Sequence, residues 1–126
     1  MIFGIGTDLC AADRMAAKLQ KPAFVRRVFS RAEQALLNER GGTHRAETAA
    51  ANFAAKEAFL KAAGTGLREP FSLCEIEAVR QENGAPAYRF SGQTAAWVAQ
   101  HRLRARLSLS HEGGMALAFC TLEEES

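Results

Sequence analysis

The spacing of hydrophobic and polar residues separates strands from helices in the first third of the chain. Apolar and β-branched residues at 3–9, interrupted by two glycines, predict a first strand that ends near Asp8. Apolar residues then recur every three or four positions in 12–19 and in 23–29, which predicts two short helices. Ser30 and Glu33 have the spacing of a capping box, so a third helix is expected from there toward residue 40.

The central segment, residues 46–63, is apolar around almost the whole circumference of a helix. A helix of this kind is buried on all sides, whereas a surface helix has one polar face. We therefore expect it to form the centre of the fold, beginning at Thr43 and ending at the glycines of segment 64–66.

The last part of the chain has the alternation and the turns of two β-hairpins. Asn83-Gly84 is expected to connect strands at 73–80 and 87–90, and two glycines at 113–114 to connect strands at 106–110 and 115–121. A short helix around Trp97 separates the hairpins, and acidic residues 123–125 are expected to form a solvated tail. This order predicts an α+β single domain over residues 1–126, with antiparallel strands packed on the long central helix.

Composition excludes several classes of protein. The 126 residues are 48% hydrophobic and 24% charged with a net charge of +2, which is ordinary for a globular domain. No apolar run approaches the roughly 20 residues of a membrane span, and no basic export signal precedes the first strand. We expect a cytoplasmic protein that does not contact a membrane. The three cysteines and three histidines are isolated from one another, which argues against a zinc site.

Glu57 and Asp8 are the main candidates for carboxylates with a chemical function. Glu57 lies in an apolar stripe of the central helix, where an unpaired charge is costly, so it needs a cation or solvent. One solution is an ion pair with Lys61, four residues later. Asp8 either caps the following helix or joins Glu57 around a hard cation such as Mg²⁺, which commonly takes one or two carboxylates together with substrate phosphate. The residues alone leave both alternatives open.

A basic stretch, residues 14–31, contains no acidic residue. It is either a solvated helical face or a docking surface for an acidic partner, with Met15, Leu19, Phe24 and Val28 as interleaved apolar contacts. Nucleic-acid binding is a further alternative, but no recognised motif and few stacking aromatic residues support it. His111 follows a polar strand face and either contacts a ligand or marks a hairpin corner.

Two segments resemble holo-acyl-carrier-protein synthases, which are phosphopantetheinyl transferases. They are residues 4–9, GIGTDL, and residues 53–66, FAAKEAFLKAAGTG; the Asn83-Gly84-x-Pro86 turn and the strand 107–111 are similar as well. The resemblance implies the fold of that family and a homotrimer with sites between neighbouring subunits. It also implies transfer of 4'-phosphopantetheine from coenzyme A to a serine of an apo acyl carrier protein, in support of fatty acid biosynthesis.

The same resemblance implies the roles of individual residues. Asp8 and Glu57 would bind Mg²⁺ at the coenzyme A pyrophosphate, and Lys61 would neutralise the phosphate under attack. The residues implied to bind coenzyme A are Lys61, Gly64, Thr65, Gly66, Asn83, Gly84, Pro86 and His111, together with His44 and Arg45 near the site of its 3'-phosphate. Those implied to bind the carrier protein are Arg14, Met15, Lys18, Lys21, Arg26 and Arg27.

Three positions depart from the family pattern. Ala11 stands where a glutamate is common, and Asn52 and Ala85 stand where basic residues are frequent. At Ala11 a supporting contact to the metal site or another polar contact is expected to be absent, and the departures at Asn52 and Ala85 predict weaker coenzyme binding or pocket charges supplied from elsewhere. They also leave a non-catalytic carrier-binding relative as an alternative, against which the presence of Asp8, Glu57 and Lys61 argues.

Overall fold

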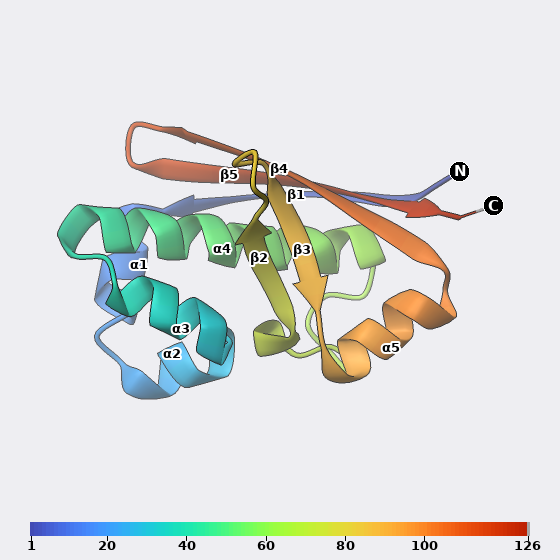
Figure 1. Ribbon diagram of the computed structural model, residues 1–126, viewed down its shortest axis with the longest axis horizontal. Coiled ribbons are helices and arrows are strands. Elements are labelled where there is room, and N and C mark those ends of the chain that lie inside the picture. The colour runs from blue at the N-terminus through green and yellow to red at the C-terminus, as the bar shows by residue number, and fades with distance from the viewer. Residues whose placement is uncertain (126) are drawn as a thin grey trace.

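Figure 1 shows the computed structural model of the protein, which describes residues 1–125. The helices are α1 (Ala12–Lys18), α2 (Pro22–Val28), α3 (Arg31–Asn38), α4 (Gly42–Ala63), a 3₁₀ turn η1 (Leu73–Glu75) and α5 (Gly92–Gln100). The strands are β1 (Ile2–Ala11), β2 (Ile76–Arg80), β3 (Pro86–Phe90), β4 (Leu103–Glu112) and β5 (Met115–Glu124). The predicted α+β class is confirmed.

Helix α4 is the centre of the fold, as its sequence predicts. It lies along the three-stranded antiparallel sheet, and the β2–β3 hairpin crosses in front of it in the view of Figure 1. Alanine, which has the highest helix propensity, provides most of its buried positions. The helix begins after Gly41 and ends at Gly64, whose φ of 84° is the left-handed conformation that glycine adopts readily.

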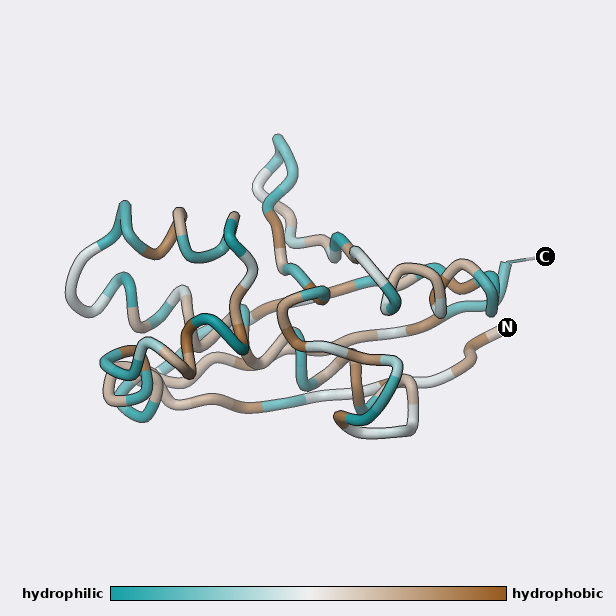
Figure 2. The backbone as a smooth tube through the Cα atoms, turned by 90° about the horizontal axis from the view of Figure 1, so that it is seen from below, coloured by the Kyte–Doolittle hydropathy of each residue, from teal (hydrophilic) through white to brown (hydrophobic). Residues whose placement is uncertain are grey.

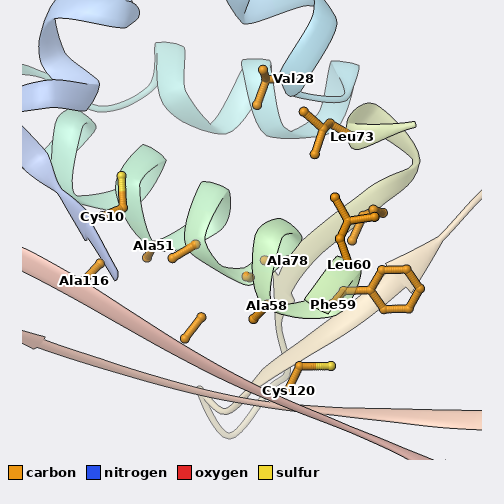
Figure 3. Close-up of a cluster of buried hydrophobic side chains, with 14 of the residues drawn as sticks. Cys10, Val28, Ala51, Ala58, Phe59, Leu60, Leu73, Ala78, Ala116 and Cys120 are labelled. Carbon is orange, nitrogen blue, oxygen red and sulfur yellow. The ribbon is translucent and has the colours of Figure 1, made fainter. Parts of the chain in front are cut away.

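The sheet has the strand order β1-β5-β4 and presents small side chains to α4. Figure 3 shows Ala51 and Ala58 of α4 facing the side on which Ala116 and Cys120 of β5 lie. Isolated cysteines among apolar neighbours are expected in the core; Cys10 and Cys120 are buried there, whereas Cys74 is only half-buried. Small residues on both surfaces let the helix approach the sheet closely, which fixes the position of strand β1 relative to α4.

Several predicted boundaries are wrong. Strand β1 continues past Asp8 to Ala11, and residues 73–75 form the 3₁₀ turn, where a strand was expected. The expected acidic tail is largely part of β5: Glu123 lies opposite Ile2 and accepts a hydrogen bond from Arg106 Nε at 2.7 Å. Hydrogen bonding to strands that are distant in the sequence determines where these elements begin and end. The local alternation of apolar and polar residues carries no information about that pairing.

Among residues 1–125, no helix is both long enough and apolar enough to span a membrane. In Figure 2, the strand that starts at the N-terminus, β1, is mostly brown or pale and has one short teal stretch. The polar residues of this strand are Thr7 and Asp8. The candidate site begins at these residues.

Candidate active site

Strand β1 brings Asp8 to α4 because of the glycines that precede it. A methyl group at Gly4 would overlap the carbonyl oxygen of Ala62, and one at Gly6 would overlap that of Ala58. Side chains along a strand alternate between its two faces, so Asp8 lies on the same face as these two glycines. At Gly4 and Gly6 the backbone of β1 therefore packs directly against the backbone of α4. Two residues later on the same face, the carboxylate of Asp8 points toward the helix.

Asp8 does not cap a helix. The residue that precedes α1 is Ala11, whose side chain makes no capping hydrogen bond, so the capping interpretation of Asp8 is wrong. The carboxylate instead meets Lys61 of α4, with Lys61 Nζ 3.2 Å from Asp8 Oδ1 and 2.9 Å from the carbonyl oxygen of Thr7. The Asp8 side chain is 19% exposed and that of Lys61 is 56% exposed, so a ligand can reach both.

Glu57 lies one turn before Lys61 and is partly buried. Within residues 1–125, the ion pair that Lys61 forms is with Asp8, so the alternative of a direct pair between Glu57 and Lys61 is not the one that the structure has. Burial raises the pKa of Glu57 and the negative charge of Asp8 raises it further, against the opposing effect of Lys61 and Lys18. The net effect of burial and of these charges is that the Glu57 carboxyl is harder to ionise than a free glutamate.

One hollow of about 200 Å³ contains both carboxylates. Its walls come from β1, α1 and α4, and they include two basic residues of α1, Arg14 and Lys18. The lining residues are Asp8, Leu9, Cys10, Arg14, Met15, Lys18, Phe53 and Glu57. The structure thus joins the predicted metal-binding carboxylates to the start of the basic stretch, which the sequence could only place on separate segments.

The donors in this hollow fit a hard cation. Among the residues that the structure describes, no group of three or more histidine, cysteine, aspartate or glutamate side chains is suited to hold a metal. Mg²⁺ needs fewer protein ligands, because water and substrate phosphate complete its coordination. The negative charge of Asp8 makes Glu57 harder to ionise, and a divalent cation between them would relieve that effect, so the donor set of the two carboxylates fits it.

The basic stretch is divided between α1 and α2. Arg14, Lys21, Arg26 and Arg27 are exposed and Lys18 is partly exposed, with its Nζ 5.5 Å from the ring centre of Phe24. The apolar part of the predicted docking surface is mostly wrong, because Met15 and Val28 are only 1% exposed and Leu19 is 9% exposed. These side chains form the core under the helices, and the basic ends remain outside.

The remaining residues predicted to bind coenzyme A lie at four separate places on the chain. His44 and Arg45 are in the first turn of α4, whereas Gly64, Thr65 and Gly66 follow its last turn. At about 1.5 Å per residue, the two groups are about 30 Å apart along the helix.

The third place is the β2–β3 turn. Its Asn83 Oδ1 accepts a hydrogen bond from Ala85 N at 2.9 Å, Gly84 has a φ of 87°, and Pro86 begins β3. His111 lies apart from all three, at the end of β4, and lines a different hollow of about 110 Å³ with Glu47 and Ala50. One chain alone does not gather the predicted coenzyme-binding residues around one ligand.

A buried polar network beside Glu57 was not predicted. Lys56 is fully buried, and its Nζ donates to Glu33 Oε1 at 2.7 Å, to Leu73 O at 2.8 Å and to Ile76 O at 2.6 Å. Glu33 Oε2 also accepts from Asn52 Nδ2 at 3.3 Å. The capping box indicated that Glu33 begins α3, but no local pattern indicated its partner 23 residues later. The network fixes α3, η1 and β2 to α4.

Comparison with known proteins agrees with this arrangement. The sequence profile described as "4'-phosphopantetheinyl transferase superfamily" matches residues 4–120. A holo-[acyl-carrier-protein] synthase of Magnetococcus marinus is 40% identical over 129 residues, covering 98% of this chain and 94% of the relative.

Solved structures give the same result. The crystal structure of holo-[acyl-carrier-protein] synthase from Neisseria meningitidis has a TM-score of 0.89 and 33% identity, and covers 98% of this chain and 100% of that chain. A holo-(acyl-carrier-protein) synthase from Bacillus anthracis, in complex with CoA (3',5'-ADP), has a TM-score of 0.85 and 31% identity, with 99% of each chain covered. The chain belongs to the 4'-phosphopantetheinyl transferase superfamily, among the holo-acyl-carrier-protein synthases.

Proposed function

We propose that this chain transfers 4'-phosphopantetheine from coenzyme A to a serine of an apo acyl carrier protein and so supports fatty acid biosynthesis. The observation that carries the proposal is the hollow in which Asp8 and Glu57 lie beside Arg14 and Lys18. Two carboxylates there can hold a cation for a pyrophosphate, and the basic residues lie where an acidic carrier could bring its serine. Family membership supports the same reaction.

In this reaction the serine oxygen forms a bond to the pantetheine-side phosphorus of coenzyme A. The bond from that phosphorus to the oxygen bridging the two phosphates breaks, and 3',5'-adenosine bisphosphate leaves. Mg²⁺ held by Asp8 and Glu57 would supply neutralisation of the pyrophosphate charge. Lys61 lies next to Asp8 and can place its exposed ammonium group on the phosphate.

The serine hydroxyl must also lose its proton. Glu57 is the candidate acceptor on this chain, because its carboxylate lies in the hollow where the serine would enter. A water molecule held in the same hollow is the alternative acceptor. Either group would lie between the two substrates and would move one proton away from the attacking oxygen.

A homotrimer with shared sites is part of the proposal. The outer face of the β1-β5-β4 sheet exposes large apolar side chains, which are Ile5 at 62%, Leu9 at 61%, Phe119 at 40% and Leu117 at 38%. Leu9 and Leu117 are paired across β1 and β5, so the exposed residues form a continuous stripe. An apolar stripe of this kind favours association. A neighbouring subunit could then bring its His111 or the first turn of its α4 to this chain's site.

The carrier is expected to dock on the exposed basic ends of α1 and α2. Arg14, Lys18, Lys21, Arg26 and Arg27 present positive charge at and beyond the rim of the hollow. Such a surface attracts an acidic partner and orients it before chemistry. The enzyme is expected to work in the cytoplasm, where coenzyme A and the carrier protein would be available.

The test incubates the protein with apo carrier protein, coenzyme A and Mg²⁺ and measures the carrier by mass spectrometry. Addition of one phosphopantetheine group, absent when coenzyme A is omitted, is the expected result. A carrier that binds and stays unmodified would identify a non-catalytic relative. Binding of nucleic acid without binding of the carrier or of coenzyme A would identify a nucleic-acid protein. Sedimentation of the same sample tests for a species of three chains.

A further inference from the structure

A second hollow, of about 290 Å³, lies between α3 and the β2–β3 hairpin. Apolar residues of α3 and β2 form its walls, and three arginines and two glutamates line it as well. The lining residues are Ala32, Glu33, Leu36, Arg40, Glu77, Ala78, Val79, Arg80 and Arg89. None of the residues assigned above to metal, coenzyme or carrier binding is among them.

Both carboxylates of this hollow already have a cation. Glu33 Oε1 is 2.7 Å from Lys56 Nζ, and Glu77 Oε2 is 2.6 Å from Arg89 Nε. Arg40 and Arg80 are in a different situation. Within residues 1–125, no carboxylate lies within 4.0 Å of either guanidinium group. After the paired charges are set aside, two positive charges remain in the hollow and no negative one.

These two guanidinium groups influence each other. Partial burial lowers the pKa of Arg80, and the charge of Arg40 lowers it further. Arg40 is also held in place, because its Nη1 donates to Thr48 Oγ1 of α4 at 2.6 Å. Two like charges from separate elements, one of them fixed by a hydrogen bond, form a site that an anion would stabilise. A phosphate monoester suits such a site, because its oxygens accept several hydrogen bonds from arginine forks.

The position of the pair relates it to the coenzyme. Arg80 is paired with Pro86 across the β2–β3 hairpin, so it lies at the base of the Asn83–Pro86 turn. Thr48, which holds Arg40, lies one helical turn after His44. The arginines therefore connect two of the places where coenzyme-binding residues are expected. Asn52 and Ala85, where the resemblance suggested basic residues, provide no charge of their own.

We infer that Arg40 and Arg80 form a phosphate-monoester subsite that receives the 3'-phosphate of coenzyme A, an inference that rests on the proposed function. The subsite compensates for the missing basic residues at Asn52 and Ala85. It gives the chain a means to distinguish coenzyme A from dephospho-coenzyme A, which lacks that phosphate.

The experiment measures binding of coenzyme A, dephospho-coenzyme A and inorganic phosphate by calorimetry at fixed Mg²⁺. The wild-type protein and Arg40→Gln/Arg80→Gln are compared. Glu77→Gln/Arg89→Gln, which removes an ion pair of the same hollow without changing its net charge, is the matched control. Thr48→Val keeps both charges but removes the hydrogen bond that positions Arg40. It tests whether that positioning contributes to coenzyme A binding. Thermal unfolding confirms that each variant is folded. If the double glutamine variant is not folded, Arg40→Lys/Arg80→Lys replaces it in the comparison.

We expect the wild type to prefer coenzyme A, and the double glutamine variant to lose about tenfold or more in coenzyme A affinity. Its affinity for dephospho-coenzyme A should stay the same, and Glu77→Gln/Arg89→Gln should behave as wild type. The lysine variant should lose part of the preference, because lysine keeps the charge and lacks the fork. Weaker inorganic phosphate binding with an unchanged coenzyme preference would overturn the assignment to the 3'-phosphate.

Two further outcomes contradict the inference. In one, the double variant binds coenzyme A as the wild type does. In the other, it loses coenzyme A and dephospho-coenzyme A equally. In both cases the wild-type protein still binds coenzyme A, so the proposed function is not contradicted. A wild-type protein that binds neither form of the coenzyme would overturn the proposed function as well, so the two failures can be distinguished.

Discussion

Lys61 Nζ lies 3.2 Å from Asp8 Oδ1, and this ion pair joins the last turns of α4 to the middle of β1. The two residues are 53 positions apart in the sequence. Glu57 lies on the same helix one turn earlier and contributes the second carboxylate of the hollow. The candidate site therefore depends on how closely β1 packs against α4, and the first prediction concerns that packing.

Gly6→Ala should damage both stability and activity. The added methyl group would overlap the carbonyl oxygen of Ala58, so β1 must move away from α4 and take Asp8 with it. Overpacking of this kind costs about 1 to 3 kcal/mol in the free energy of unfolding, which urea denaturation measures. Gly41→Ala is the control, because no atom lies within 4 Å of a methyl group there. Equal stability of the two variants would show that strand and helix can separate without cost.

Lys56→Met should destabilise the protein strongly. It leaves Glu33 buried without its cation, and breaking a buried ion pair from one side costs about 3 to 5 kcal/mol. The double variant Lys56→Met/Glu33→Gln removes both charges, so it should lose less than the sum of the two single variants. Urea denaturation of all four proteins at one concentration gives this coupling. Additive losses would mean that the pair contributes nothing specific.

Glu57→Gln should stabilise the metal-free protein at neutral pH. The pKa of Glu57 is raised above its ordinary value of 4.5, so the folded state binds this proton more tightly than the unfolded state. Stability that Glu57 contributes is present below pH 4.5 and is lost as pH rises through the folded-state pKa. The advantage of the glutamine variant should therefore grow as pH rises from 4 toward 7 and then level off.

Thermal unfolding across that pH range tests this prediction, and Mg²⁺ provides the control. Added Mg²⁺ should raise the melting temperature of the wild type more than that of Glu57→Gln, because the variant lacks one metal-binding carboxylate. A glutamine variant that is less stable than the wild type by the same amount at every pH would contradict the repulsion between Glu57 and Asp8.

Charge reversal on the exposed basic residues should weaken carrier recognition selectively. In Arg14→Glu/Lys21→Glu/Arg27→Glu, three exposed contacts of about 0.2 to 1 kcal/mol each are lost, so the KM for the carrier should rise several-fold to about a hundredfold. The value of kcat should fall less, and added salt should weaken the wild type most. Coenzyme A affinity, measured by calorimetry, should not change. An unchanged KM and salt dependence would place the docking surface elsewhere.

The sequence predicted the elements better than the contacts between them. The all-round apolar pattern of α4 and the glycine turns of both hairpins are local signals, and the structure confirms them. Asp8 was assigned to a strand end because β1 continues to Ala11 only through pairing with β5, which lies more than 100 residues away. The ion-pair partner of Lys61 depends on the fold for a related reason. Helical spacing places Glu57 within reach of Lys61, whereas only the packing of β1 on α4 brings Asp8 to it.

Residues that act through distant partners could not be found from the sequence. Glu33 and Lys56 each belonged to a recognised local pattern, yet their buried pair depends on how α3 packs against α4. Arg40 and Arg80 carried no pattern at all, and only the folded hairpin places them in one hollow. The carboxylates of the site were identifiable in advance because Glu57 is a charge in an apolar stripe, which is a visible conflict within one helix.

The most direct test measures the initial rate of holo carrier formation against Mg²⁺ concentration for the wild type, Asp8→Asn and Glu57→Gln. Both variants keep the size of the side chain and remove one carboxylate. We expect the wild-type rate to depend on Mg²⁺ and each variant, confirmed to be folded, to lose most of the activity at every Mg²⁺ concentration. A variant that forms holo carrier at the wild-type rate, or a wild-type rate unaffected by removal of divalent cations with a chelator, would contradict the assignment of Asp8 and Glu57 as the metal-binding pair of a phosphopantetheinyl transferase.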